Sequence, residues 1–185
     1  MQAARGTSLS DAGTSRTPRG SARAKAVLVA VAAAAYAVDV GSKVLAVQHL
    51  ADGDREVVGT WFVLHLTRNP GAAFSTGIEF TVVLSVLAMV AVGVVVWLGR
   101  RVGTTGWAWA MGLLLGGVAG NLTDRLFREP GPMRGHVVDF LMVPNWPVFN
   151  VADICINVAA GLIILQTVRG ITLDGTRVSP REKKA

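Results

Sequence analysis

The stretch from Phe80 to Leu98, FTVVLSVLAMVAVGVVVWL, contains nineteen residues and no charged side chain. A helix needs about 20 predominantly apolar residues to cross the ~30 Å hydrocarbon core of a bilayer. Three more apolar blocks of similar length occur at Ala26 to Val47, Gly106 to Leu122 and Val148 to Val168. The chain is 51% apolar and only 16% charged, which excludes an ordinary soluble domain. The sequence therefore predicts an all-α integral membrane protein with four transmembrane helices.

The positive charge, a net +6, is distributed as expected for a membrane protein. Twelve of the 18 Lys and Arg residues lie before the first block, between the second and third, or after the fourth. The positive-inside rule then predicts that both termini are cytoplasmic. The two longer loops, Val57 to Phe74 and Phe127 to Pro147, are predicted outside. Because membrane topology accounts for the charge, no nucleic-acid partner is predicted.

The regions outside the apolar blocks divide into tails and short extended segments. Residues 1–25 and 169–185 lack hydrophobic periodicity and are predicted to be disordered cytoplasmic tails around a membrane domain at 26–168. Val57 to Leu66 is dense in β-branched and aromatic residues and is followed by the turn-forming Asn69-Pro70-Gly71. With Val137 to Val143, it predicts a small extracytoplasmic β-rich segment.

Three of the apolar blocks carry polar side chains at helical spacing, which places each set on one helix face. Because a charge in hydrocarbon costs at least a few kcal/mol, such residues indicate a functional site. At about 1.5 Å per residue, they fall in the outer half of the membrane, with Asp39 roughly 12 Å and Asp153 roughly 8 Å inside their blocks. The sets are Asp39 and Lys43, then Asn121, Asp124 and Arg125, then Asn150, Asp153 and Asn157.

Two acids offer a specific chemistry. Asp139 lies in an extended segment and Asp153 in a helix, so a peptide can pass between them. Two neighbouring carboxyl groups cannot both ionise and therefore share a proton. The ionised one can activate water while the protonated one hydrogen-bonds the scissile carbonyl. This pair predicts an aspartic endopeptidase.

The other polar groups are predicted to support this pair. Asp39 is expected to pair with Lys43, and Asp124 with the adjacent Arg125. Ser42 and Lys43 point about 100° apart on a helix, which argues against a Ser/Lys dyad. The histidines have no companion cysteine or acid at metal-ligand spacing, so neither a metal nor another cofactor is expected.

Two further features of the apolar blocks have structural interpretations. Gly112, Gly116 and Gly120, with Gly117 alongside, form a small-residue face that predicts close helix packing. Cys155, the single cysteine, is expected to be a buried structural thiol.

Five stretches resemble, in order, the sequence blocks of the lipoprotein signal peptidases, also called signal peptidase II. The resemblance spans about residues 26 to 168 and implies an endopeptidase that removes signal peptides from prolipoproteins. It also implies cleavage before a diacylglyceryl-modified cysteine, without a metal or organic cofactor. The stretches are Asp39-Val-Gly-Ser-Lys43, Asn69-Pro-Gly-Ala-Ala-Phe-Ser75, Gly117-Val-Ala-Gly-Asn-Leu-Thr-Asp-Arg125, Val137-Val-Asp-Phe140 and Phe149-Asn-Val-Ala-Asp153.

The resemblance implies residue roles and a location as well. Asp139 and Asp153 correspond to the catalytic pair. Prolipoproteins and membrane lipid are the implied partners, and the bacterial cell membrane is the implied location, with the active site toward the extracytoplasmic side. A monomer is expected, although the sequence does not determine the oligomeric state. The supporting polar positions are Asp39, Lys43, Asn69, Asn121, Arg125 and Asn150.

A small proton-coupled membrane transporter is the alternative from another functional class, since four helices with intramembrane acids also describe such proteins. A transporter site should lie near the bilayer midplane and open to each side in turn. The polar residues here are predicted to lie toward one face instead, which favours the peptidase.

Overall fold

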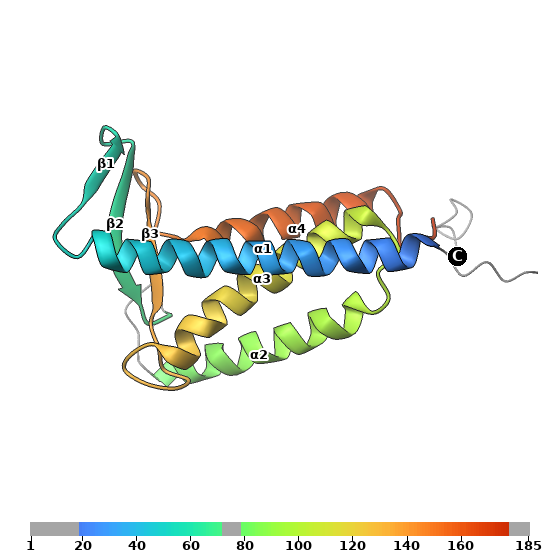
Figure 1. Cartoon of the computed structure of the whole chain (residues 1–185), viewed down its shortest axis with the longest axis horizontal. Coiled ribbons are helices and arrows are strands. Elements are labelled where there is room, and N and C mark those ends of the chain that lie inside the picture. The colour runs from blue at the N-terminus through green and yellow to red at the C-terminus, as the bar shows by residue number, and fades with distance from the viewer. Residues whose placement is uncertain (1–18, 72–78, 178–185) are drawn as a thin grey trace, which may run out of the picture.

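The structure, a computed structural model of the 185-residue chain, describes residues 19–71 and 79–177. Four helices lie side by side, and a small sheet crosses one end of them (Figure 1). Both ends of the described chain lie at the opposite end of the helices. The elements are α1 Arg19–His49, β1 Arg55–Val58, β2 Phe62–Asn69, α2 Glu79–Gly99, α3 Thr105–Phe127, β3 Val137–Met142 and α4 Val151–Val168.

Three of the helices are long and apolar enough to cross a membrane. These spans are Ala22–His49, Thr81–Gly99 and Val151–Val168. The remaining helix, α3, has 23 residues and the most central position, packing against α1, α2 and α4. Its composition is less apolar because it carries glycines and the polar residues that end the predicted third block. The described fold is thus that of a helical membrane protein with a small antiparallel sheet.

Glycines on α3 allow its neighbours to approach closely, as the small-residue face predicted. A Cβ at Gly116 would come within 2.7 Å of the Ala32 carbonyl oxygen on α1. One at Gly117 would come within 2.7 Å of the Ala152 carbonyl oxygen on α4. Real Cβ atoms do not tolerate such distances to backbone, so any side chain here would push the helices apart. These contacts hold α1 and α4 at the distance that the polar site requires.

Helix α2 is the least buried helix and lies apart from α1 and α4 in Figure 1. Its two buried hydroxyls connect it to the loops near the sheet. Thr81 Oγ1 donates to the Pro70 carbonyl (2.6 Å), and Ser85 Oγ donates to the Met133 carbonyl (2.7 Å). These bonds stabilise the loops that follow β2 and α3.

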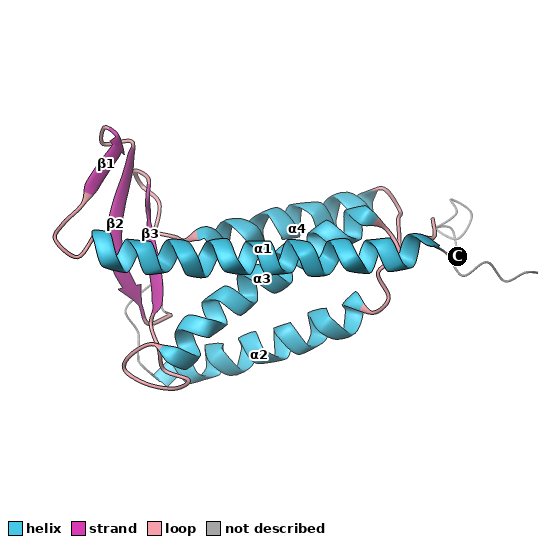
Figure 2. Ribbon diagram, viewed as in Figure 1, coloured by secondary structure: helices cyan, strands magenta, loops and turns pink. Residues whose placement is uncertain are grey.

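The sheet has the antiparallel order β1-β2-β3 (Figure 2). The β1–β2 hairpin and β3 confirm both predicted extended segments. Thr67 of β2 pairs with Asp139 of β3, and Asn69 pairs with Val137. The sheet packs on the end of α1, where Ala46, Leu50, Val138 and Phe140 form a buried cluster. This packing fixes the position of Asp139 above the helices.

Several predicted boundaries were wrong. Helix α1 begins at Arg19, so residues 19–25, predicted as part of a disordered tail, are helical; residues 1–18 lie outside the described residues. The apolar part of the third block ends at Leu122, and helix α3 continues through the predicted polar end at Arg125 to Phe127. Helix α4 begins at Val151 and not at Val148. Asn150 is its N-cap and has an extended backbone, so the residues from Pro147 to Asn150 lie before the helix. Helices α1 and α3 thus include basic and polar residues at their ends, which a prediction from apolar blocks alone leaves out.

The segment 170–177 is also more ordered than predicted. Ile171 and Arg177 form an antiparallel bridge. The Ile171 carbonyl accepts from Trp107 Nε1 (3.0 Å), and the Leu173 carbonyl accepts from Gly103 N (3.0 Å). These contacts show that the segment packs over the start of α3. The packing is favourable because the two carbonyls accept bonds from donors that would otherwise be buried without partners.

Candidate active site

A capping box at the start of α4 positions one of the two predicted catalytic acids. Asn150 Oδ1 accepts from the backbone N–H of Asp153 (3.0 Å), and Asp153 Oδ2 accepts from the backbone N–H of Asn150 (3.0 Å). This reciprocal arrangement satisfies two free donors at the helix start. Asp153 consequently lies in the first turn of α4, shallower than the roughly 8 Å predicted.

Amide side chains hold both acids. Asp139 Oδ1 accepts from Asn150 Nδ2 (2.6 Å), and its Oδ2 accepts from Asn69 Nδ2 (3.0 Å). Asp153 Oδ1 accepts from Asn121 Nδ2 (3.0 Å). Asn150 therefore contacts both carboxyl groups and fixes one relative to the other. With the backbone N–H of Asn150 on Asp153 Oδ2, each carboxyl oxygen receives one N–H donor and can accept another bond, from water or a shared proton.

Lys43 is the centre of the supporting network. Its side chain is fully buried, and Nζ lies 2.8 Å from Asp39 Oδ2 and 3.0 Å from Asp124 Oδ2. The third ammonium hydrogen is donated to Asn121 Oδ1 (2.8 Å). Because an ammonium group only donates, this bond fixes the Asn121 amide with Nδ2 facing Asp153. Lys43 thus orients a donor to the dyad without contacting either acid.

The predicted Asp39–Lys43 pair is confirmed, and Asp39 also accepts from the backbone N–H of Ala152 (2.8 Å). This places a carboxylate at the N-terminus of α4, where the helix dipole favours negative charge. Asp39 therefore joins α1 to the helix that carries Asp153.

The predicted pairing of Asp124 with Arg125 was wrong. Asp124 pairs with Lys43 and with Arg128 at i+4, and it accepts from the backbone N–H of Val138 (3.2 Å). Adjacent helical residues point in different directions, whereas residues four apart lie on one face. The Arg125 guanidinium lies near Gly71, and its Nη1 has no hydrogen-bond partner among the described residues.

Asp139 and Asp153 line one cavity of about 470 Å³ between β3, the loop before α4 and α4 itself. Its lining combines polar and apolar side chains, which suits a peptide. Cavity residues outside the hydrogen-bonded network include Trp146, Pro147, Val148, Phe149 and Asn157. Asn157, predicted on the same helix face as Asp153, is confirmed at this cavity.

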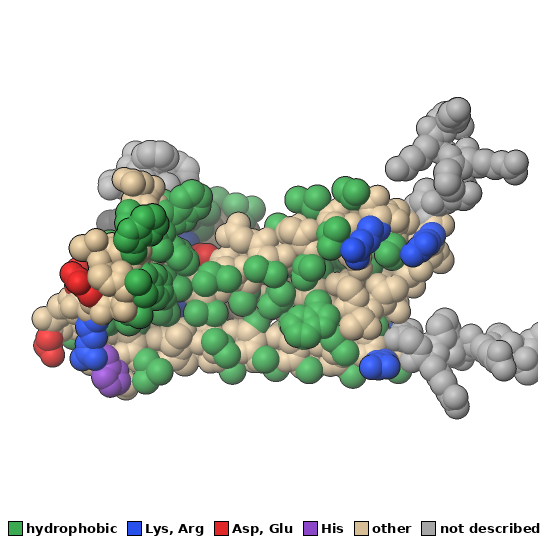
Figure 3. All heavy atoms as spheres, turned by 90° about the horizontal axis from the view of Figure 1, so that it is seen from above, with side chains coloured by type: hydrophobic (Ala, Val, Ile, Leu, Met, Phe, Trp, Pro, Cys, Tyr) green, Lys and Arg blue, Asp and Glu red, His purple; other side chains and the backbone are tan. Residues whose placement is uncertain are grey.

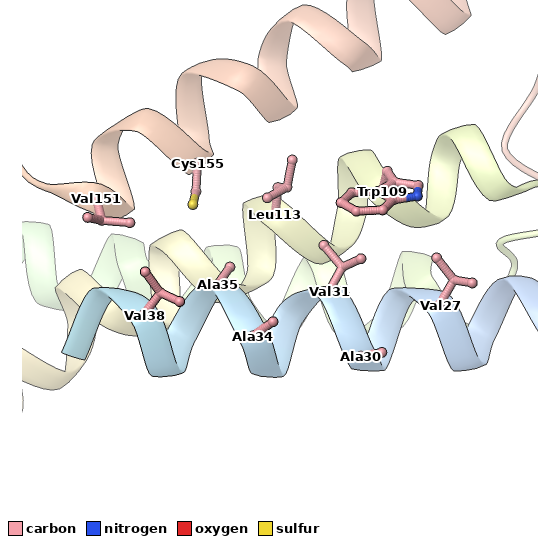
Figure 4. A pocket seen from close by; sticks show the side chains of 10 residues that line it. All are labelled: Val27, Ala30, Val31, Ala34, Ala35, Val38, Trp109, Leu113, Val151 and Cys155. Carbon is pink, nitrogen blue, oxygen red and sulfur yellow. The ribbon is translucent and has the colours of Figure 1, made fainter. Parts of the chain in front are cut away.

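A second cavity, of about 550 Å³, lies between α1, α3 and α4 and contains none of the predicted site residues (Figure 4). Small and apolar side chains line it, including Ala34, Val38 and Leu113, and the sulfur of Cys155 points into it. Cys155 is buried and free, as expected. The polar cavity is therefore the candidate active site.

The two acids lie in different electrostatic surroundings. Burial raises the pKa of Asp139 to about 6, even though the amides of Asn69 and Asn150 oppose the shift. Asp153 accepts two N–H bonds and lies in the first turn of a helix, where negative charge is favoured. Asp139 is thus disposed to hold a proton, as the acid of an acid–base pair must.

Comparison with known proteins agrees with this geometry. The sequence matches the family described as Signal peptidase (SPase) II over residues 31–169. The chain belongs to the signal peptidase II family. A protein of Leifsonia xyli named lipoprotein signal peptidase is 46% identical over 90% of this chain and 78% of that protein. The lipoprotein signal peptidase of Mycobacterium avium is 45% identical over 86% of each chain.

A solved structure, described as a bacterial membrane enzyme determined by the in meso method at 1.9 Å, has the same fold. Its TM-score is 0.68 at 21% identity, covering 78% of this chain and 94% of that one. Membership of the signal peptidase II family makes this chain a peptidase of signal peptides, and the transporter alternative finds no support.

The structure connects most of the predicted site residues directly. Among the described residues, Arg125 and Asn157 lie outside the network of side-chain bonds formed by Asp39, Lys43, Asn69, Asn121, Asp124, Asp139, Asn150 and Asp153. Sequence reasoning missed Arg128 as a partner of Asp124, although the i, i+4 spacing signals it. It also missed the capping box, which Asn150 and Asp153 signal by their three-residue spacing.

Proposed function

We propose that this chain is a membrane-embedded aspartic endopeptidase that removes signal peptides from prolipoproteins, with Asp139 and Asp153 as its catalytic acids. The observation that carries the proposal is that Asn150 bonds Asp139 and caps the helix whose first turn contains Asp153, and that both acids line one cavity. The substrate class follows from the family and from the names of the relatives.

In the proposed reaction, Asp153 is the base and Asp139 the acid. A water between them loses a proton to Asp153, and its oxygen attacks the scissile carbonyl carbon. Asp139 donates its proton to the carbonyl oxygen, which gives a tetrahedral diol. Asp153 then protonates the leaving nitrogen as the carbon–nitrogen bond breaks, and Asp139 recovers its proton from the diol. Both acids return to their starting states.

We further propose that all four helices cross the membrane, with both termini in the cytoplasm and the sheet outside. The positive-inside distribution of Lys and Arg supports this orientation. The cavity then lies near the outer hydrocarbon boundary, beside the exposed apolar side chains Ile154 and Val158 of α4. A diacylglyceryl-modified cysteine can therefore present its peptide bond to the dyad while its acyl chains remain in the outer leaflet.

Arg125 is proposed to contact the substrate. Its buried Nη1 has no partner among the described residues, and an unpaired buried donor is costly. A backbone carbonyl of the bound substrate is the acceptor we propose for it.

Purified protein in detergent, supplied with a lipidated prolipoprotein and no ion gradient, tests the proposal. Asp139→Asn and Asp153→Asn should each abolish cleavage, because Asn keeps the shape but cannot exchange the proton. The double variant should be scarcely slower than either single variant, since the acids act as a unit. Asp174→Asn, at an exposed acid in the C-terminal segment, is the matched control and should cleave normally. Substantial turnover by either dyad variant would show that the catalytic pair has been misassigned.

A further inference from the structure

The apolar cavity between α1, α3 and α4 is a groove that is open on one side, and it is called the apolar groove below. One face of α1, from Val27 to Val38, forms its wall over a length of about 16 Å. Val38 is 58% exposed and Trp109 of α3 is 49% exposed, so no other part of the described protein covers the groove. Its length is about half of the ~30 Å hydrocarbon core, which is the depth of one leaflet.

The apolar groove is closed at the end near the sheet and opens toward the other end of the bundle. At the closed end, Asp39 of α1 accepts from the backbone N–H of Ala152 of α4 (2.8 Å). Figures 1 and 4 show α1 and α4 diverging from this contact, with Leu113 and Trp109 of α3 between them. In the proposed orientation, the open end is the cytoplasmic end.

Each of the two helices that form the walls carries an arginine at the open end. Arg23 lies one helical turn before Val27, and Arg169, the C-cap of α4, lies about five turns after Val151 on the same face. Both arginines are exposed, and neither forms an ion pair with another described residue. Figure 3 shows Lys and Arg side chains gathered at this end of the helices. The apolar groove thus ends in positive charge.

The lining of the apolar groove suits a hydrocarbon chain beneath a polar headgroup. Ala30 and Ala34 are small and leave room along α1, and no charged side chain lines the groove. The indole nitrogen of Trp109 lies on the side of its ring toward Val27, at the open end (Figure 4). Tryptophan concentrates at the headgroup level because its ring is apolar and its N–H is polar.

We propose that the apolar groove binds an acyl chain of an anionic phospholipid from the cytoplasmic leaflet, with the phosphate group between Arg23 and Arg169. Basic pockets between transmembrane helices on the cytoplasmic side bind anionic headgroups in this way. An apolar helix in the groove would leave both guanidinium groups without a partner, whereas phosphate oxygens accept from them in pairs. The proposal rests on the proposed membrane orientation and not on the peptidase activity. Its consequence is that a lipid supports α4 on the face opposite Asp153.

Photo-crosslinking in liposomes tests the proposal. The full chain is reconstituted in phosphatidylcholine with a small fraction of phosphatidylglycerol that carries a diazirine in one acyl chain. After irradiation, mass spectrometry locates the lipid adducts. Adducts on residues 27–38 and Leu113 should be several-fold more frequent than those on Val90 and Val94 of α2, which are similarly exposed. Unlabelled phosphatidylglycerol should displace the groove adducts at several-fold lower concentration than unlabelled phosphatidylcholine.

Two pairs of variants separate the apolar groove from the rest of the lipid-facing surface. Arg23→Gln should reduce the groove adducts several-fold, whereas Lys25→Gln, about 200° around the helix, should leave them unchanged. Ala34→Phe fills the groove and should remove the adducts, whereas Ala33→Phe, about 100° away, should not. Equal melting midpoints in lipid-free detergent are the control for folding.

Three results would overturn the proposal. Equal competition by the two unlabelled lipids, or groove adducts that persist in Arg23→Gln, would show only the ordinary lipid that surrounds any membrane protein. A groove without lipid adducts would also overturn it. In that case, disulfide formation between copies that carry Ala34→Cys would identify a second copy of the chain as the occupant.

Discussion

Replacing Lys43 with methionine is the most direct test of how the site is held together. The ammonium group lies 2.8 Å from Asp39 and 3.0 Å from Asp124, and its side chain is completely buried. Methionine fills similar space, so the change removes charge and hydrogen bonds with little effect on packing. Asp124 keeps Arg128, whereas Asp39 keeps only the backbone N–H of Ala152.

The expected loss of stability follows from the contacts of Lys43. Coulomb's law with an effective dielectric constant of about 20 gives roughly 6 kcal/mol for two charges 2.8 Å apart. Desolvation of both groups offsets part of this attraction, and removing one partner of a buried pair costs about 3–5 kcal/mol. At about 2–4 °C per kcal/mol for a chain of this size, the unfolding midpoint should fall by roughly 6–20 °C.

The assay uses the chain's own cysteine. Cys155 is free and 9% exposed, so a fluorogenic maleimide will react with it mainly after unfolding in detergent. Lys25→Met, at an exposed position on the same helix, is the matched control and should leave the midpoint unchanged. Asp39→Asn should restore much of the stability of Lys43→Met, because Asn keeps the acceptor for Ala152 without the charge.

Two results would refute this reasoning. If Lys43→Met melts together with Lys25→Met, the buried pair does not stabilise the fold. If Asp39→Asn restores nothing in the Lys43→Met background, the loss does not arise from an unpaired Asp39. Lys43→Met should also cleave more slowly, since Asn121 would lose the bond that directs its amide to Asp153.

Three further predictions follow from the same structure. Burial raises the pKa of Asp139 in the folded protein to about 6, from 3.8 in the unfolded chain. The folded protein therefore holds this proton more tightly than the unfolded chain. The free energy of unfolding should consequently fall as the pH rises from about 4 to 6. Asp139→Asn should then be more stable than the parent at pH 8 by up to about 3 kcal/mol, and equally stable below pH 4, in thermal melts at each pH; an advantage only at low pH would contradict the sign. Cysteines placed at Asp54 and Arg134 should react with an impermeant maleimide only from outside the cell, and labelling only from the cytoplasm would reverse the topology. Ending the chain at Gly170 should lower the melting midpoint more than Trp107→Phe does. Trp107→Phe removes a single hydrogen bond, worth about 0.5–1.5 kcal/mol. If the truncated chain melts at the same temperature as the parent, the C-terminal segment does not stabilise the bundle.

The sequence by itself determined the features that depend on local spacing. Apolar blocks of spanning length predicted all four helices, and β-branched runs predicted the strands. The i, i+4 spacing of Asp39 and Lys43 predicted their pairing, because residues four apart share a helix face whatever surrounds the helix. The polar set at the start of the fourth block, with Asp139 in the extended segment before it, also indicated Asp139 and Asp153 as the acids of interest.

Only the tertiary structure decided which groups meet across elements. That Lys43 bonds Asp124, that Asn121 faces Asp153 and that Asn150 reaches Asp139 all depend on how the helices are rotated and how closely they pack. The sequence contains the small residues of α3 that permit this approach, but not the crossing geometry that results. The raised pKa of Asp139 is likewise a tertiary property, because its cause is burial between a sheet and helices that are distant in the chain.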